Sequence, residues 1–216
     1  MKWKFFKTNW FPIAVVILVL ASIIKKNLPG FAAGSKKQVP EKLTDNGAIA
    51  STTESHAGIF SWASRNSIDL PDIPESVAVP FLQRFGKVAA GEQTKFGIPA
   101  SVILACAYIN SFSGKRDWAA QYQNYFGLGC GGGWEGATET VGGVCIRRYE
   151  KAWDSFRDFS KYLSGRKDFD AIRQSCGTDW KAWAKALDSK KISEVSDFEG
   201  EMVKVIETYR LFELDK

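Results

Sequence analysis

The sequence predicts a mainly α-helical domain with a small β-lobe, preceded by one N-terminal membrane helix. Three observations lead to this fold class. An uncharged, mostly apolar run occupies residues 10–24, helical periodicity prevails from about residue 75, and a glycine-rich stretch with two cysteines interrupts it at 127–145. With 216 residues, of which 45% are hydrophobic and 25% charged, the chain has a globular composition and the length for one domain with appendages.

The apolar run near the N-terminus predicts an uncleaved signal-anchor at residues 1–26. Its 15 residues are fewer than a spanning helix needs, but flanking aromatic and lysine side chains lengthen the span at the headgroup level. Lys25 and Lys26 end the run directly, where a cleavable signal would carry a small-x-small site. A cleaved signal peptide and a core helix of a soluble protein are the alternatives.

Residues 27–74 have the composition of a flexible linker. Gly, Ser, Thr, Ala and Lys are frequent, and the Pro29-Gly30 pair breaks any regular pattern. His56, the chain's single histidine, lies in this segment. Because His-dependent catalytic triads and most zinc sites need a histidine held rigidly in a pocket, we expect no such site, no metal and no cofactor.

The distribution of charge argues against a nucleic-acid partner. The formal net charge is +5, but residues 1–45 alone carry eight lysines and two acidic residues, so the rest of the chain is close to neutral. A nucleic-acid-binding domain normally keeps its basic excess on the folded part. Residues 127–132 spell G-x-G-x-x-G, but they follow no clear strand and open no helix, so no dinucleotide site is expected.

The globular domain, at residues 75–216, begins with two predicted helices. Apolar residues at spacings of three and four mark one face of the first helix: Val77, Phe81, Leu82, Phe85 and Val88. The second lies between Pro99, a favourable first-turn residue, and Gly114, a natural stop. It is apolar on every side, which predicts burial. Its last turn carries the polar pair Asn110-Ser111, which either points into a cleft or caps the helix end.

The stretch 127–145 holds eight glycines and predicts a short, irregular β-hairpin or lobe. Three helices are expected after it. Their inward residues are Trp153, Phe156 and Leu163 in the first, Trp180, Trp183, Ala184 and Leu187 in the second, and Phe198, Met202, Val205, Ile206, Tyr209 and Phe212 in the third. Asp179 is placed to cap the second of these helices.

Four cysteines allow three full pairings. Cys130 and Cys145 flank the lobe, and a disulfide closing this loop would contribute roughly 3 kcal/mol. Two unpaired thiols are the alternative. Cys106 is expected in the core, and Cys176 either reaches it or stays free. A disulfide would indicate an oxidising compartment, which places the domain in the periplasm and the N-terminus in the cytoplasm.

The segments around these elements form a recognisable series. They are Ala89-Ala90-Gly91-Glu92, then Phe96 to Ala105, then Asn124-Tyr125-Phe126-Gly127-Leu128, and then Cys145-Ile146-Arg147-Arg148-Tyr149. In order and spacing the series resembles the bacterial glucosaminidase family of lysozyme-like peptidoglycan hydrolases, over about residues 77–215. The part from Cys130 to Tyr149 resembles the form common in the Bacteroidota, in which two cysteines bracket the β-lobe. The resemblance implies a lysozyme-like fold.

The sequence departs from this family where catalysis takes place. The family's core helix ends in Glu-Ser, and that Glu is the catalytic acid; here the pair is Asn110-Ser111. The family's Gly-Tyr-Ala-Thr segment, whose Tyr lines the active site, has no counterpart in residues 190–195. Since an amide has no proton to give, the resemblance implies an inactive domain. Glu139, in the lobe, is a candidate second carboxylate or else a solvated surface residue.

We therefore expect a single-pass inner-membrane protein whose periplasmic domain binds peptidoglycan glycan strands or serves as a structural subunit of an envelope protein assembly. The alternative is an active endo-beta-N-acetylglucosaminidase that uses Glu139. Candidate substrate-binding residues are Ser111, Tyr108, Tyr125, Phe126 and Trp134. For the four aromatic residues, core packing is the competing interpretation.

Overall fold

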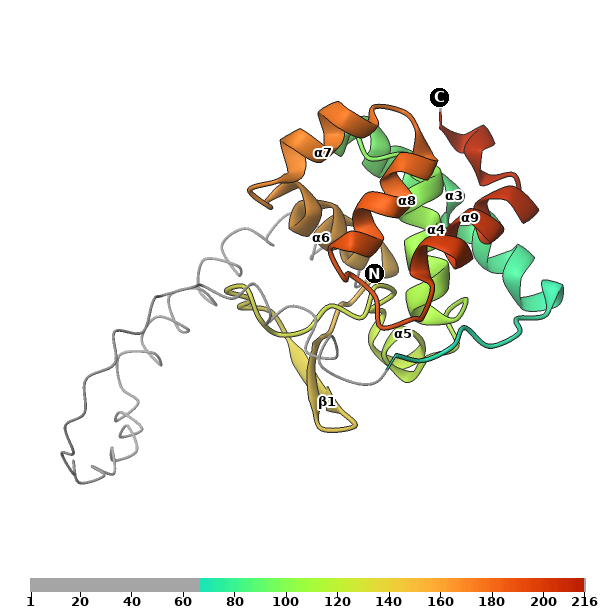
Figure 1. Ribbon diagram of the computed structural model, residues 1–216. Helices are drawn as coiled ribbons and strands as arrows, with labels where there is room; N and C mark the ends of the chain where they lie inside the picture. Colours follow the sequence, from blue (N-terminus) through green and yellow to red (C-terminus); the bar gives the residue numbers. More distant parts are fainter. Residues whose placement is uncertain (1–66, 216) are drawn as a thin grey trace, which may run out of the picture. The chain divides into compact units, whose positions relative to one another are not determined.

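Figure 1 shows a computed structural model of the chain, in which residues 67–215 are described. The predicted signal-anchor and most of the predicted linker lie outside these residues. In the part of the chain that the structure describes, no helix is both long and apolar enough to cross a membrane.

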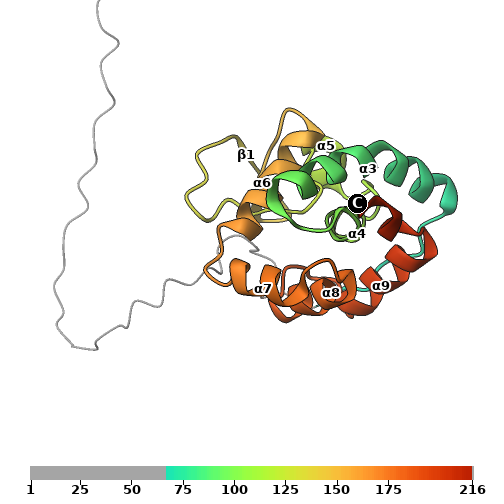
Figure 2. The same cartoon turned by 90° about the horizontal axis from the view of Figure 1, so that it is seen from above.

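The core is built around α4 (Ala100–Ser111), all twelve residues of which are buried. α3 (Glu75–Phe96), α6 (Ala152–Ser164), α8 (Trp180–Ser189) and α9 (Phe198–Thr208) pack against it. Figure 2 shows α4 with α3 and α6 on one side and α8 and α9 on the other. A helix surrounded in this way needs apolar residues on every side, and its sequence has them, so the prediction of a buried helix is confirmed.

The lobe is an antiparallel hairpin of β1 (Thr138–Val141) and β2 (Val144–Arg147). Gly142 and Gly143 connect the strands with φ values of 56° and 78°. A two-residue hairpin turn of this hand requires positive φ at both positions, which glycine adopts without strain. The disulfide between Cys130 and Cys145 is present, as predicted, and it joins the start of the lobe to β2. Short α5 (Asp117–Tyr122) precedes the lobe.

The last part of the domain differs from the prediction in one element. Within the described residues, four α-helices follow the lobe, because α7 (Phe169–Cys176) lies between α6 and α8. Phe169 and Cys176 are its buried residues, so its apolar face is too short to stand out in the sequence. The predicted cap of α8 is confirmed: the Asp179 side chain accepts hydrogen bonds from the N–H groups of Lys181 and Ala182.

Two aromatic side chains expected in the core lie on the surface. Trp153 is 45% exposed, and α6 instead buries Phe156, Phe159 and Leu163. Phe212 is 37% exposed and belongs to a final 3₁₀ turn, η2 (Leu211–Leu214), rather than to α9. The sequence left open whether Cys176 pairs with Cys106. In the structure both cysteines are free and buried.

Candidate functional site

The polar pair at the end of α4 hydrogen-bonds within its own last turn. Asn110 is 3% exposed, and its Nδ2 donates to the Cys106 carbonyl at 2.9 Å. Ser111 is fully buried; its Oγ donates to the Ala107 carbonyl at 2.6 Å and accepts from the Gly114 N–H at 2.8 Å. Ser111 thus stabilises the turn that ends α4, three residues before the predicted stop.

The loop after α4 has an unusual backbone. Phe112, Ser113 and Gly114 have φ values of 51°, 54° and 81°. Left-handed conformation is unfavourable for Phe and Ser, and it persists only where the surroundings hold it. Here the Ser113 N–H donates to the Tyr108 carbonyl at 2.9 Å. Because strained backbone clusters at functional sites, this loop belongs to the candidate site.

Arg116 connects this loop to the segment between α8 and α9. Its guanidinium pairs with the Glu194 carboxylate, and both side chains are largely buried. The guanidinium carbon also lies 4.4 Å from the ring centroid of Phe112 and 3.8 Å from that of Trp118. Burial lowers the pKa of Arg116, and the attraction of Glu194 opposes that effect. The pair therefore fixes the α8–α9 loop against the end of α4.

The same loop is held from its other side by the start of the described chain. Ile68 forms a parallel bridge with Val195. Its N–H donates to the Glu194 carbonyl at 3.0 Å, and its carbonyl accepts from the Ser196 N–H at 2.8 Å. This loop stands where the family's Gly-Tyr-Ala-Thr segment is expected, and here it buries Ile192. Residues 67–70 fell within the predicted linker, so this contact was not foreseen.

Glu139 lies on the lobe, on β1 opposite Ile146. Its carboxylate forms an ion pair with Arg148 at 2.9 Å, and the two side chains are 33% and 55% exposed. Pairs this exposed contribute about 0–1 kcal/mol. Within the described residues, no hydrogen bond or ion pair joins Glu139 to Asn110.

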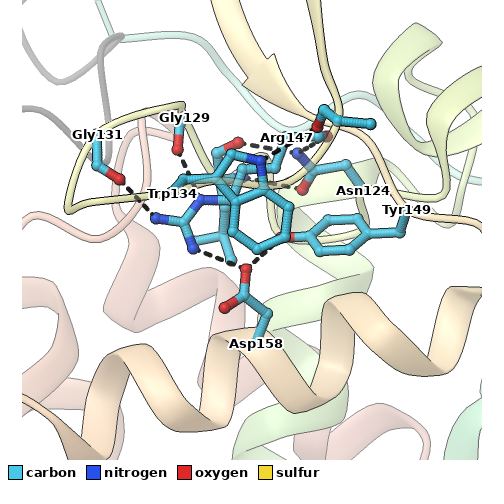
Figure 3. A network of polar contacts seen from close by, with 9 residues as sticks. Asn124, Gly129, Gly131, Trp134, Arg147, Tyr149 and Asp158 are labelled. Carbon is cyan, nitrogen blue, oxygen red and sulfur yellow. Dashed lines mark hydrogen bonds and ion pairs between the residues drawn. The ribbon is translucent and has the colours of Figure 1, made fainter. Parts of the chain in front are cut away.

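A buried polar network fixes the lobe to α6 (Figure 3). Arg147 is 4% exposed; it donates to the carbonyls of Gly129 at 2.8 Å and Gly131 at 2.7 Å, and it pairs with Asp158 at 2.7 Å. The Tyr149 hydroxyl donates to the same Asp158 oxygen at 2.6 Å. Burial, reinforced by the charge of Asp158, raises the pKa of Tyr149, which keeps it a donor.

Asn124 joins the same network from the segment before the lobe (Figure 3). Its Nδ2 donates to the carbonyls of Leu128 and Arg147, each at 2.9 Å, and its Oδ1 accepts from the Leu128 N–H at 2.9 Å. Asn124 is fully buried, so all of these groups are satisfied inside the protein. The family-like segments at 124–128 and 145–149 therefore share one structural role, which is to position the lobe.

The aromatic residues predicted for a sugar-stacking groove have different surroundings. Phe126 is fully buried and stacks on Phe159 with ring centroids 4.0 Å apart, so it follows the core-packing interpretation and has no face for a sugar. Tyr108 and Tyr125 are 4% and 5% exposed, and each lines a separate cavity. Trp134 is partly exposed on the lobe, where its ring packs against Arg147 with 4.8 Å from guanidinium carbon to centroid.

The described residues hold no group of three or more His, Cys, Asp or Glu side chains that would suit a metal ion. What they do hold is a central buried helix, a disulfide-closed lobe and a loop that faces the helix end. This combination defines a lysozyme-like helical domain. The chain belongs to the glucosaminidase family, described as mannosyl-glycoprotein endo-beta-N-acetylglucosaminidase, which matches residues 86–211.

Solved structures support the same fold. The catalytic domain of the autolysin Auto from Listeria monocytogenes is 18% identical with a TM-score of 0.55, covering 68% of this chain and 91% of that one. An N-acetylmuramoyl-L-alanine amidase from Staphylococcus aureus is 22% identical with a TM-score of 0.57, covering 69% of this chain and 48% of that one. A peptidoglycan hydrolase from Sphingomonas sp. A1 is 20% identical with a TM-score of 0.52, covering 62% and 91%. No curated protein matches the chain.

Proposed function

We propose that this chain is a membrane-anchored, periplasm-facing glucosaminidase-like domain of the Bacteroidota type that binds peptidoglycan without cleaving it. One observation carries the proposal. The resemblance to the family's motif assigns Asn110 to the position of the catalytic acid, and the Asn110 amide is 3% exposed and hydrogen-bonded to the Cys106 carbonyl. The family and a structural relative named as a peptidoglycan hydrolase support the wall polymer as the ligand.

The chemistry of the reaction explains why this position matters. Glycoside hydrolysis uses a carboxylic acid to protonate the leaving oxygen and a second carboxylate as base or nucleophile. A carboxamide has no proton to donate near neutral pH, so the general-acid contribution of about 10²–10⁴-fold is lost. Because the Asn110 Nδ2 group is engaged with its own helix, it does not replace that donor.

Glu139 does not supply the missing acid. It lies partly exposed on β1, its carboxylate is held in the ion pair with Arg148, and within the described residues no hydrogen bond or ion pair joins it to Asn110. As a lone base it would lack the partner that activates the leaving group. The competing function, an active endo-beta-N-acetylglucosaminidase using Glu139, is therefore the outcome that the experiment below is designed to detect.

Two features support the anchor and the compartment. The apolar run at residues 10–24 ends at two lysines without a cleavage site. The Cys130–Cys145 disulfide favours an oxidising compartment. Together they support an inner-membrane protein with its C-terminal domain in the periplasm, where peptidoglycan and other envelope proteins are accessible to it.

The test compares cleavage and binding on purified sacculi. The full-length chain and its Glu139→Gln variant are incubated with sacculi, released muropeptides are measured, and bound protein is recovered by sedimentation. Glu135→Gln, a second acidic position on the lobe, is the matched control. We expect no muropeptide release from any of the three proteins and equal sedimentation of all three. Release by wild type and Glu135→Gln, but not by Glu139→Gln, would assign catalysis to Glu139 and overturn the proposal.

Restoring the family residue tests the same site from the other direction. We expect Asn110→Glu to remain at least 100-fold below a family hydrolase assayed in parallel, since the loop at 190–195 lacks the family's Tyr and a catalytic group without its supporting residues is usually misplaced. Burial at this position would raise the pKa of the new carboxyl, which suits an acid, so weak release is compatible with the proposal. Full activity in the single variant would show that position 110 alone separates this domain from an enzyme.

A further inference from the structure

A cavity of about 300 Å³ opens beside the loop that follows α4. The N-terminal half of α3 forms one wall, the loop at 113–115 forms another, and Tyr125 completes it. The volume is at the lower end of the roughly 300–1,000 Å³ of small-molecule sites. It therefore suits a ligand of one or two small residues rather than a glycan strand.

The floor of this cavity is aromatic. Phe81, Phe85 and Tyr125 line it, with ring centroids 5.9 Å apart for Phe81 and Tyr125 and 4.8 Å apart for Phe85 and Tyr125. Gly114 also lines it at φ 81°; a Cβ there would lie 3.5 Å from both the Phe81 and the Tyr125 rings. Because Gly114 has no Cβ, room remains beside the two rings for a methyl-sized group in van der Waals contact with them.

The rim of the cavity is positively charged. Arg84 and Lys115 line it, no Asp or Glu does, and neither cation has an ion-pair partner among residues 67–215. The Arg84 guanidinium carbon lies 4.9 Å from the Phe85 ring centroid, so the charge is held over the aromatic floor. Burial raises the pKa of Tyr125, and the positive charge of Arg84 opposes that effect.

A buried hydroxyl at the same cavity lacks a partner. Ser113 is 6% exposed and lines the cavity, and its Oγ makes no hydrogen bond within the described residues. Leaving a buried hydroxyl unpaired costs free energy that a ligand atom would recover. The backbone at Ser113 is left-handed, with φ 54°.

We propose that this cavity binds the free C-terminal carboxylate of a short peptide that ends in a small side chain, namely the end of the stem peptide attached to the glycan strand. Arg84 and Lys115 neutralise the carboxylate, Ser113 contributes a hydrogen bond, and the aromatic floor contacts a methyl side chain. A neutral sugar would not require two cations. The identity of the peptide rests on the proposed wall-binding function. The match to a carboxylate rests on the cavity alone.

The test uses the full-length chain with N-acetyl-D-alanyl-D-alanine and its C-terminal amide as probes, followed by isothermal titration calorimetry. We expect millimolar binding of the acid and at least tenfold weaker binding of the amide. Arg84→Gln and Lys115→Gln should each weaken binding of the acid at least fivefold. Lys161→Gln, an exposed cation on α6 away from the cavity, should leave it unchanged. Equal binding of acid and amide, or no binding of the acid, overturns the proposal.

Ser113→Ala provides a second readout that a folding defect would not mimic. Since it removes an unpaired buried hydroxyl, we expect it to weaken binding of the acid severalfold without lowering the melting temperature. Sedimentation with sacculi separates the two proposals. Wild type that binds sacculi but not the dipeptide refutes the cavity assignment alone. Wild type that binds the dipeptide but not sacculi refutes the wall-binding function and leaves the carboxylate site standing.

Discussion

Replacing Arg147 by Met should destabilise the domain far more than the same change at its neighbour Arg148. Arg147 places three donors on Gly129, Gly131 and Asp158, with its side chain 5% exposed. Removing one partner of a buried charged pair costs about 3–5 kcal/mol. Asp158 is 18% exposed and keeps the Tyr149 hydroxyl, so part of its charge is re-solvated and the lower end of the range applies. We expect a loss of about 3 kcal/mol for Arg147→Met.

Arg148 is the matched control because it lies next in sequence and also forms an ion pair. Its side chain is 55% exposed and its partner Glu139 is 33% exposed, so Arg148→Met should cost about 0–1 kcal/mol. The assay is urea unfolding of the full-length chain in mild detergent, followed by tryptophan fluorescence, with the disulfide intact in every sample. Equal unfolding midpoints for the two variants would refute the assignment of Arg147 as the residue that fixes the lobe.

Three further predictions concern other parts of the chain. The intact chain should fractionate with the inner membrane, and removal of residues 1–26 should release it; a mature N-terminus near residue 35 would contradict this. Non-reduced peptide mapping should join Cys130 to Cys145, and replacing both by Ser should raise amide exchange in the lobe while the helices stay protected; free thiols in periplasmic protein would contradict it. Asp179→Ala should lower the free energy of unfolding by about 1 kcal/mol, since α8 loses its cap, and an unchanged urea midpoint would contradict it.

Much of the helical framework could be predicted because it depends on local patterns. α4 is apolar on every side, and a helix of that kind has no other stable location than the core. Asp179 caps α8 through contacts two and three residues away, which sequence spacing describes directly. Trp153 was misassigned because its spacing fits the apolar face of α6, whereas that face buries Phe156 and Phe159 and leaves Trp153 exposed next to the Arg157 guanidinium.

The candidate site was less predictable because its contacts join residues that are distant in sequence. Asn110 could be singled out by resemblance alone, since its hydrogen bond to Cys106 is an ordinary helix contact. Nothing local distinguishes Arg147, which is buried, from Arg148, which is exposed. The Arg116–Glu194 pair spans 78 positions. A charged residue flanked by aromatics, as Arg116 is by Phe112 and Trp118, is the one signal that would have drawn attention to it.

The bridge at Ile68 is the place where a force applied along the preceding chain would first reach the described part of the domain. Because Ile68 runs parallel to Val195, a pull along the chain at residue 67 loads its two hydrogen bonds together, in shear, rather than one after the other. The load then passes into the loop that Arg116 holds against the end of α4, before it reaches the first turn of α3. A force at residue 67 therefore reaches the loop at 192–196 and its Arg116–Glu194 pair before it reaches α3.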